Sequence, residues 1–377
     1  MNGLRRLIFL LTLLFPSAAP AQIREEYRPL SELLATRPER VATEGNRVEV
    51  IPSGSELFFR MQEDIMGATQ TIHASFFIFH NDEAGFVIRS AFQLQALDSL
   101  EVQYIAEDFI QKSRFIRPMK KAGVKVGHQL FFPLIPRNHQ KYLLLDGTLA
   151  YAGGCNIARN NLLEWEDMAV RLRGPVVAQM EQLHARNWKR TGGSPSVREP
   201  KETESYAGGV IVQPVDEDPA EKSHLNLQAY IWALDHAKEY FYAKTPYFLP
   251  PSSLVKALSD AARRGVDVRL VIPRHKDARV ALITPFEGTY FKTLLAAGVH
   301  IHLRESLFDH SKVFSCDHYL SAVGSVNLDA LSLLYNYENN LFFYDEGIST
   351  QIKRLIEEDF SDCEELHLEG ARHGIIR

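Results

Sequence analysis

Apolar and polar positions along the chain follow two alternating periods, which predict strands and helices in turn. Short runs rich in β-branched and aromatic residues, such as residues 48–52 and 71–79, predict buried strands. Between them, residues 55–68 place apolar side chains near helical spacing and predict an amphipathic helix. Strands that alternate with helices of this length favour βαβ units and a largely parallel sheet. The pattern therefore predicts an α/β fold.

The same alternation occurs a second time after a polar stretch at residues 192–208, which begins with Gly, Ser and Pro and predicts a linker. We expect two tandem, similar α/β/α halves, at residues 47–191 and 209–377, each with a mixed, largely parallel sheet flanked by helices. Residues 22–46 are polar and predict an N-terminal arm with a short helix at residues 30–34.

A set of polar residues recurs at one constant separation, which supports the two halves more strongly than periodicity does. Each residue of the first set is followed, 171 positions later, by a residue of the same type (310 − 139 = 171). The residues His139, Lys141, Asp146 and Asn156 correspond in this way to His310, Lys312, Asp317 and Asn327. A separation of this length is that of a domain. The two copies therefore predict one shared active site at the seam between the halves.

These residue types suit phosphoryl transfer. Each copy offers an imidazole, an ammonium group, an amide, and a glycine-containing loop in which Gly154 or Ser325 could bring backbone N–H groups close to a phosphate. Asn156 and Asn327 are expected at the start of the following helix, where an anion is favoured. Two histidines allow a double displacement, in which one attacks phosphorus and the other protonates the leaving alkoxide. No metal and no cofactor is required.

The constant separation also identifies carboxylates that could orient the histidines. Asp167 and Glu338 are both acidic and both lie 28 residues after their histidine, whereas the neighbouring Glu166 has Tyr337 as its counterpart. We predict Asp167 and Glu338 as the orienting residues, each serving the histidine of either half. Asp146 and Asp317 are included in the candidate site, although a turn-forming role is favoured for them.

Charge and the N-terminus limit the functional classes. The chain carries a net charge of −5, which becomes −7 once Arg5 and Arg6 are removed with residues 1–21, and an acidic protein is not suited to general nucleic-acid binding. Residues 1–21 combine these arginines with a short apolar run and small residues before Ala21, which predicts a secretory signal peptide; an uncut membrane anchor is the alternative. We expect an exported protein, periplasmic or peripheral on a membrane. The three cysteines lack metal-ligand spacing, and Cys155 and Cys316 are expected as buried packing residues.

The motifs resemble those of a known family. His-x-Lys, four residues, Asp, six residues and Gly-Gly/Ser-x-Asn look like the phospholipase D superfamily in both copies. Residues 137–141, 245–250 and 336–338 are similar to the bacterial cardiolipin synthase branch. The resemblance implies a metal-independent phosphatidyltransferase that passes phosphatidyl from one phosphatidylglycerol to another through a phosphohistidine. It also implies His139 as nucleophile and His310 as general acid/base.

Two departures from that branch concern the acceptor and the membrane. The branch usually has two N-terminal membrane helices, where this chain has the predicted signal peptide, and it usually has an arginine near the position of Leu331. If water replaces the alcohol, the same site is an exported phospholipase D or, less in keeping with the charge, a nuclease. A non-catalytic lipid-binding protein is disfavoured because both motifs are intact. The expected partner is phospholipid at a membrane surface, without nucleic acid, and the expected state is a monomer.

Overall fold

The computed structural model describes residues 22–107, 113–129, 136–196, 203–274 and 284–368. The predicted signal peptide, residues 1–21, lies outside the described residues. The α-helices are α1 (Arg28–Leu34), α2 (Gly54–Gly67), α3 (Glu83–Leu97), α4 (Ser113–Lys121), α5 (Pro175–Arg190), α6 (Leu225–His236), α7 (Ser252–Arg263), α8 (Thr284–Ala297), α9 (Ala330–Leu334) and α10 (Glu346–Glu358). Within the described ranges, no helix is both long and apolar enough to cross a membrane.

A sheet of 15 strands runs through the molecule in the order β17-β12-β11-β9-β13-β14-β16-β8-β1-β7-β6-β5-β2-β3-β4. The first strands along the chain are β1 (Thr43–Ile51), β2 (Thr71–Phe76), β3 (Glu101–Glu107), β4 (Lys125–Gln129), β5 (Tyr142–Leu145), β6 (Leu149–Gly153) and β7 (Ala169–Arg173). The later ones are β8 (Val210–Glu217), β9 (Tyr240–Lys244), β11 (Asp267–Pro273), β12 (His300–Arg304), β13 (Val313–Cys316), β14 (Leu320–Gly324), β16 (Glu338–Tyr344) and β17 (Cys363–Glu365). A separate parallel pair joins β10 (Phe248–Leu249) to β15 (Leu328–Asp329).

The strand order repeats on the two sides of one junction. β1 pairs antiparallel with β7 on one side and with β8 on the other, so the sheet is continuous. Outward from this junction the order is β1-β7-β6-β5-β2-β3-β4 in one direction and β8-β16-β14-β13-β9-β11-β12 in the other. This order is what two similar halves would produce. The boundaries of the halves stay a prediction, and β1 begins at Thr43 rather than at residue 47.

The α/β class is confirmed, but the prediction of a largely parallel sheet is wrong. Among the described strands of the large sheet, parallel pairing is limited to β2–β3, β3–β4, β9–β11 and β11–β12, and the other neighbours run antiparallel. The cause is local: β5–β6 and β13–β14 are hairpins. Their turn residues, Asp146-Gly147 and Asp317-His318, all have positive φ, the conformation of a two-residue turn that joins antiparallel strands.

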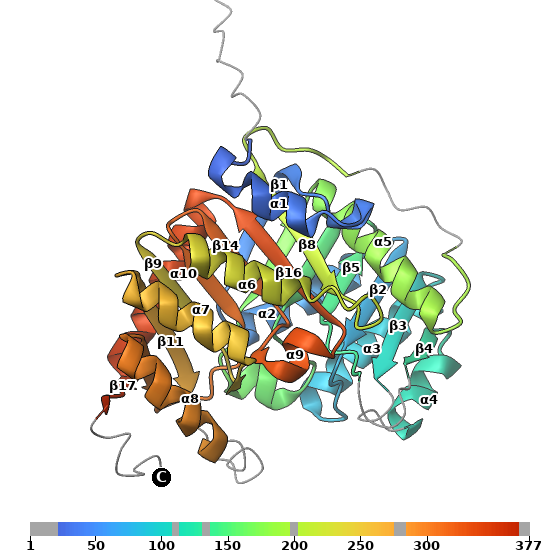
Figure 1. The fold of residues 1–377 in the computed structure, drawn as a ribbon. Helices are drawn as coiled ribbons and strands as arrows, with labels where there is room; N and C mark the ends of the chain where they lie inside the picture. The colour runs from blue at the N-terminus through green and yellow to red at the C-terminus, as the bar shows by residue number, and fades with distance from the viewer. Residues whose placement is uncertain (1–21, 108–112, 130–135, 197–202, 275–283, 369–377) are drawn as a thin grey trace, which may run out of the picture.

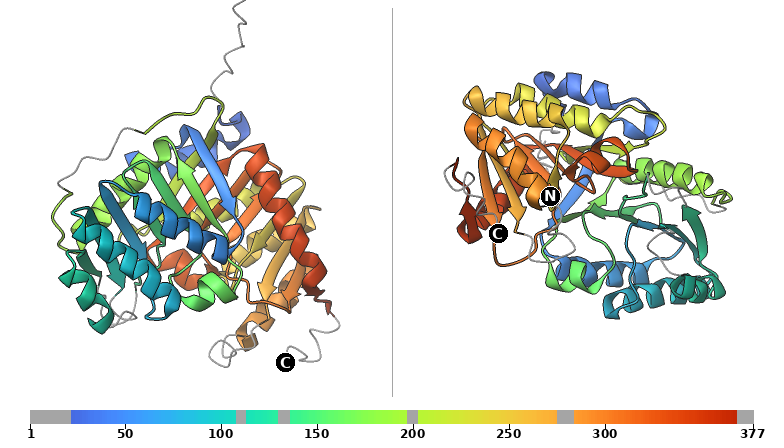
Figure 2. Two further views of the ribbon diagram at one scale, coloured as in Figure 1. Left: turned by 180° about the vertical axis from the view of Figure 1, so that it is seen from behind. Right: turned by 60° about the horizontal axis from the view of Figure 1, so that its bottom comes forward.

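Helices cover both faces of the sheet (Figures 1 and 2). One apolar cluster packs α1, α6, α7 and α8 on strands that follow residue 209, and a second packs α2, α3 and α4 on strands that precede residue 170. A third cluster contains α5 and α10 together with strands from both sides of the β1–β8 junction. Cys155 and Cys316 are buried and free, as expected.

The N-terminal arm packs against the later part of the chain. Its helix α1 forms where predicted, and Leu30 and Leu34 are fully buried in the cluster of α6, α7 and α8. The ring of Tyr27 lies 4.9 Å from that of Tyr319, and Arg40 forms a buried ion pair with Asp216 at 2.8 Å. The arm therefore contributes to the core formed by residues 209–377, although it lies at the start of the chain. From here on, residues 47–191 are called the first repeat and residues 209–377 the second repeat.

This packing predicts a cost for removing the Leu30 side chain. Leu30→Ala should lower the free energy of unfolding by about 2–4 kcal/mol, because it leaves a cavity in a filled core. Urea titration followed by circular dichroism measures the change. The exposed Glu32→Ala on the same helix is the control, with an expected effect within about 0.5 kcal/mol. Equal effects from the two variants would show that the arm does not dock as described.

Candidate active site

Backbone hydrogen bonds tie each histidine segment to the other repeat. The His139 N–H donates to the Tyr337 carbonyl at 2.9 Å, and the Tyr337 N–H donates to the Arg137 carbonyl at 2.8 Å. The second connection mirrors the first, because the His310 N–H donates to the Glu166 carbonyl at 2.7 Å. A parallel bridge forms at each place. The two motifs are thereby held side by side, in keeping with the predicted shared site.

Each imidazole meets the carboxylate of the other repeat. The Nδ1 atom of His139 lies 2.9 Å from both carboxylate oxygens of Glu338. The Nδ1 atom of His310 lies 2.8 Å from Oδ2 of Asp167. All four side chains are buried. The sequence left open which histidine each acid serves, and the structure shows crossed pairs. With the proton on Nδ1 facing the carboxylate, the Nε2 atom of each ring is left with a free lone pair.

The two lysines are buried beside the imidazoles, each only 1% exposed. The Lys141 ammonium donates to the His139 carbonyl at 2.5 Å, and the Lys312 ammonium donates to the His310 carbonyl. The Lys312 Nζ atom also lies 3.0 Å from Nδ1 of His310. A site with two ammonium groups and little water is suited to a phosphodiester anion.

This environment shifts the pKa of each of these side chains so that its neutral form is favoured. Burial, then Lys141 and Lys312, lower the pKa of His139 well below its ordinary value. Burial and Lys312 lower the pKa of His310 to about 4, although Asp167 opposes the change. Burial raises the pKa of Glu338 to about 7. Both imidazoles are therefore neutral at neutral pH in the unliganded protein.

Asp146 and Asp317 serve the fold. Asp146 accepts hydrogen bonds from the backbone N–H groups of residues 69–71 and from the Thr69 hydroxyl. Asp317 accepts from the N–H groups of residues 238–240. Each aspartate thus anchors the start of the strand next to its hairpin. Their inclusion among the catalytic residues stays a prediction, and these contacts favour the structural role.

Gly154 and Ser325 support the carboxylates, and their use as phosphate-binding residues stays a prediction. Their N–H groups donate to carbonyls of the neighbouring strand segments, at 3.2 Å and 2.8 Å. A side chain at Gly154 would place its Cβ 2.3 Å from Oδ1 of Asp167. The Ser325 hydroxyl donates to Glu338. The glycine therefore makes room for one orienting acid, and the serine binds the other.

The two asparagines lie within the site region but not at helix starts. Asn156 accepts a hydrogen bond from the Ile78 N–H at 3.0 Å and is followed by the π-helical turn η3 (Asn160–Glu164). Asn327 is followed by β15, because Leu328–Asp329 pairs with β10 before α9 begins. The Oδ1 atom of Asn327 is buried without a hydrogen-bond partner among the described residues. A phosphate contact of either asparagine stays a prediction.

Aromatic side chains that the sequence had not assigned surround the imidazoles. The ring of Phe77 lies 4.7 Å from that of His139. The rings nearest to His310 belong to Trp165 at 5.6 Å, Phe308 at 6.1 Å and Tyr247 at 6.5 Å. Phe77 follows β2 and Tyr247 follows β9, so both come after the carboxyl end of a strand that has a parallel neighbour. Binding sites of α/β proteins lie at this edge of the sheet. The position of Phe77 and Tyr247 just after a predicted strand was therefore the signal that could have identified them from the sequence.

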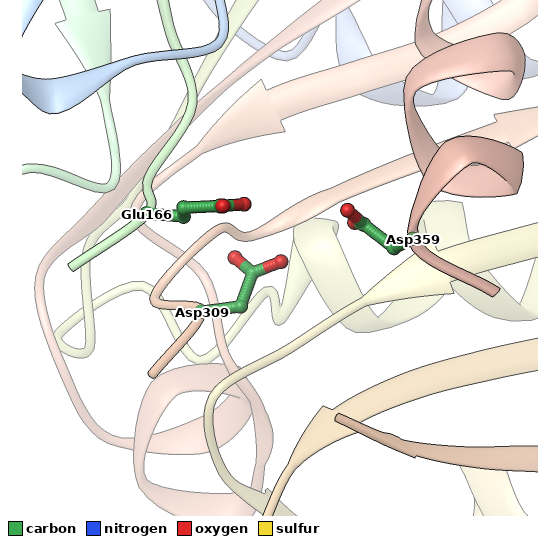
Figure 3. Close-up of side chains that lie close together, drawn as sticks. All are labelled: Glu166, Asp309 and Asp359. Atoms are coloured by element: carbon green, nitrogen blue, oxygen red, sulfur yellow. The ribbon is translucent and has the colours of Figure 1, made fainter. Parts of the chain in front are cut away.

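Three carboxylates behind His310 have the spacing of a metal site, but two cations already fill it. Glu166, Asp309 and Asp359 point toward one another (Figure 3), with oxygens within 4.8 Å. The Lys244 ammonium pairs with Asp309 and Asp359. The Arg304 guanidinium binds Glu166 at 3.0 Å, Asp309 at 3.2 Å and Asp359 at 3.1 Å. The cluster thus fits an ion-pair network, which fastens the residue next to Asp167 to the second repeat.

Known proteins share this sequence and fold. A family model described as "Cardiolipin synthase, PLD-like domain" matches residues 230–360. Cardiolipin synthase 1 of Staphylococcus epidermidis is 29% identical over 354 residues, which span 89% of this chain and 72% of that protein. The major cardiolipin synthase of Bacillus subtilis is also 29% identical over 354 residues, with 88% and 72% covered.

A solved structure agrees in fold. The phosphatidylserine synthase of Haemophilus influenzae superposes with a TM-score of 0.67 over 91% of this chain and 93% of that one, at 14% identity. The repeated motifs, the crossed histidine–carboxylate pairs and these relatives agree. The chain is similar to enzymes of the cardiolipin synthase branch of the phospholipase D superfamily.

Proposed function

We propose that the protein is a phosphatidyltransferase that makes cardiolipin from two molecules of phosphatidylglycerol through a phosphohistidine intermediate. The crossed pairs His139–Glu338 and His310–Asp167 carry this proposal, because they present two oriented imidazoles to one space. The cardiolipin synthases among the relatives support the choice of lipid.

In the first step, the Nε2 lone pair of His139 attacks phosphorus of phosphatidylglycerol. His310 takes up a proton on Nε2 when the anionic lipid binds. The bond from phosphorus to the glycerol oxygen then breaks, and the protonated His310 gives this proton to that oxygen, so that glycerol leaves. Lys141 and Lys312 offset the charge on the phosphoryl oxygens. Asp167 supports this division of roles, because it opposes the fall in the His310 pKa and so stabilises the protonated ring.

In the second step, the chemistry runs in reverse on a new alcohol. His310 takes a proton from a glycerol hydroxyl of the second phosphatidylglycerol, and the oxygen attacks phosphorus. The bond between phosphorus and His139 breaks, which releases cardiolipin and restores the neutral imidazole. Water in the place of the alcohol would give phosphatidic acid, so the half-buried rings around His310 decide the outcome by excluding or admitting water.

The remaining parts of the proposal concern location and partners. We infer export through the signal peptide at residues 1–21 and action at the surface of a membrane as a monomer, without nucleic acid. The positive n-region, the short apolar run and the acidic net charge support these inferences.

Product analysis tests the proposed reaction. The purified protein, incubated with phosphatidylglycerol vesicles, should release glycerol and form cardiolipin, and added glycerol should reverse the reaction. Thin-layer chromatography and mass spectrometry identify the lipids. His139→Ala and His310→Ala should each lose about 10³-fold or more of the rate, because each removes an essential role. Phosphatidic acid as the main product would replace the transferase with a hydrolase.

Trapping the intermediate tests the assignment of the nucleophile. Protein mixed briefly with lipid labelled at phosphorus and quenched in alkali should carry the label on His139, because phosphohistidine survives alkali. Peptide mass spectrometry locates it, with His139→Ala as the unlabelled control. A label on His310 would reverse the two roles.

The pKa values predict that an anionic ligand takes up a proton. Both imidazoles are neutral before binding, because burial and then the lysine charges lower the pKa of His310 to about 4. A phosphodiester offsets the lysine charges. The pKa of His310 should therefore rise on binding, and affinity should fall as pH rises from the free pKa through the bound one. Calorimetry with glycerophosphoglycerol in buffers of different ionisation enthalpy should show uptake of up to about one proton at pH 6 to 7.

The His310→Gln variant is the control for this measurement, since it should bind the same ligand with less proton uptake. Binding without proton uptake in the unmodified protein would contradict the neutral state of the site.

A further inference from the structure

The short helix α9 presents two faces of opposite character. Its outer face carries Leu331 and, one turn later, Tyr335, which are 51% and 49% exposed. The side chains of Ser332 and Asn336 lie on the other side, where both act on Glu338 and counter the rise of its pKa. The helix therefore lies directly over one of the orienting carboxylates, with apolar side chains facing outward.

A second exposed apolar pair lies beside the other histidine. Leu163, in η3, is 45% exposed, and Leu307, before β13, is 46% exposed. Both line one pocket of about 410 Å³ together with Trp165. The ring of Trp165 lies 4.5 Å from that of Phe308, tilted to it, and both rings are neighbours of His310. Leu163 and Leu307 lie on opposite sides of residue 209 in the sequence, so both parts of the chain contribute to the wall of this pocket.

These segments lie at one end of the molecule. Figure 1 and the view from behind in Figure 2 both place α9 and the turn near residue 160 in the lower half of the molecule, toward which the arrows of β3 and β11 point. Phe77 and Tyr247, which flank the imidazoles, also follow the carboxyl ends of β2 and β9. The exposed apolar residues therefore lie at the same end as the buried histidines.

We propose that Leu163, Leu307, Leu331 and Tyr335 form an apolar rim that enters the surface of the lipid bilayer carrying the substrate. The inference rests on the proposed function, because a membrane phospholipid must bring its phosphodiester to the buried imidazoles. Its acyl chains stay in the bilayer during that approach. Leucine and tyrosine side chains suit this position, since leucine gains from leaving water and tyrosine favours the interface.

The bilayer explains this placement better than a protein partner does. The four side chains come from three separate segments of both repeats, and each segment continues into a residue that touches a histidine or Glu338. A partner protein seated there would cover the entrance to the site, whereas a bilayer delivers the substrate through it. A second copy of the chain or a protein partner is an outcome that the experiment below would reveal.

The experiment compares two substrates and two double variants. Leu331→Gln/Tyr335→Gln removes the apolar character of α9. Leu94→Gln/Leu97→Gln is the matched control. Leu94 and Leu97 are 51% and 66% exposed and lie at the C-terminal end of α3. Each protein is assayed on phosphatidylglycerol vesicles and on dihexanoyl phosphatidylglycerol below its micellar concentration. Vesicle binding is measured by flotation with mixed phosphatidylglycerol and phosphatidylcholine.

The α9 variant should lose about tenfold or more in vesicle binding and vesicle turnover, because two side chains no longer gain from leaving water. Its turnover of the monomeric lipid should stay within about twofold of the unmodified protein, and the control variant should match the unmodified protein in every assay. Leu163→Gln/Leu307→Gln should repeat the result of the α9 variant.

Equal losses on both substrates would overturn the inference, since they would place the residues in the catalytic site. Full vesicle binding by the α9 variant would also overturn it. The same holds if light scattering shows that the variant changes from dimer to monomer while its vesicle binding is unchanged. Failure of the unmodified protein on both substrates would instead contradict the proposed function. The flotation assay would still decide the membrane contact in that case.

Discussion

The crossed hydrogen bonds between histidine and carboxylate are the constraint on which this structure depends. Each pair takes its imidazole from one repeat and its acid from the other, so neither repeat alone contains a complete pair. The backbone bonds from His139 to Tyr337 and from His310 to Glu166 repeat the same crossing one residue away. Separating the repeats would break both pairs and leave each imidazole without the acid that orients it. The pairing of β1 with β8 and the two crossed pairs of the site therefore depend on the same arrangement of the repeats.

The buried lysines make the empty site costly and the occupied site favourable. Lys141 and Lys312 are almost fully buried, and burial lowers the pKa of both. Each ammonium group is held in place by the carbonyl of its own histidine, so its position is fixed before substrate arrives. A phosphodiester that enters meets oriented positive charge and needs little rearrangement of the protein. Burial, together with this charge, keeps the imidazoles neutral before an anion binds.

The sequence predicted the site better than the sheet. A constant separation identified Asp167 and Glu338 because it reports a shared register, which survives as long as no insertion falls between motif and acid. The constant separation did not show that Gly154 makes room for Asp167. These two residues approach each other across neighbouring segments of the sheet, and such an approach leaves no pattern in the sequence around either residue. Strand direction failed for a related reason. Apolar runs in buried antiparallel strands such as β5 and β13 look like those of parallel strands, and the hairpin turns were the better signal.

The two repeats differ at a few positions next to the orienting acids, and these differences change how each acid is held. Gly154 and Ser325 occupy the same position in the two copies, yet Asp167 accepts from the Met168 N–H at 2.8 Å, whereas Glu338 accepts from the Ser325 hydroxyl. Burial raises the pKa of Glu338 to about 7. Burial, then Lys141 and Lys312, lower the pKa of His139 and keep its ring neutral, as a nucleophile requires. The helix α9 presents Ser332 and Asn336 to Glu338 and the exposed Leu331 to the outside. The two copies of one sequence pattern thus hold their orienting acids by different contacts, a serine hydroxyl on Glu338 and a backbone N–H on Asp167.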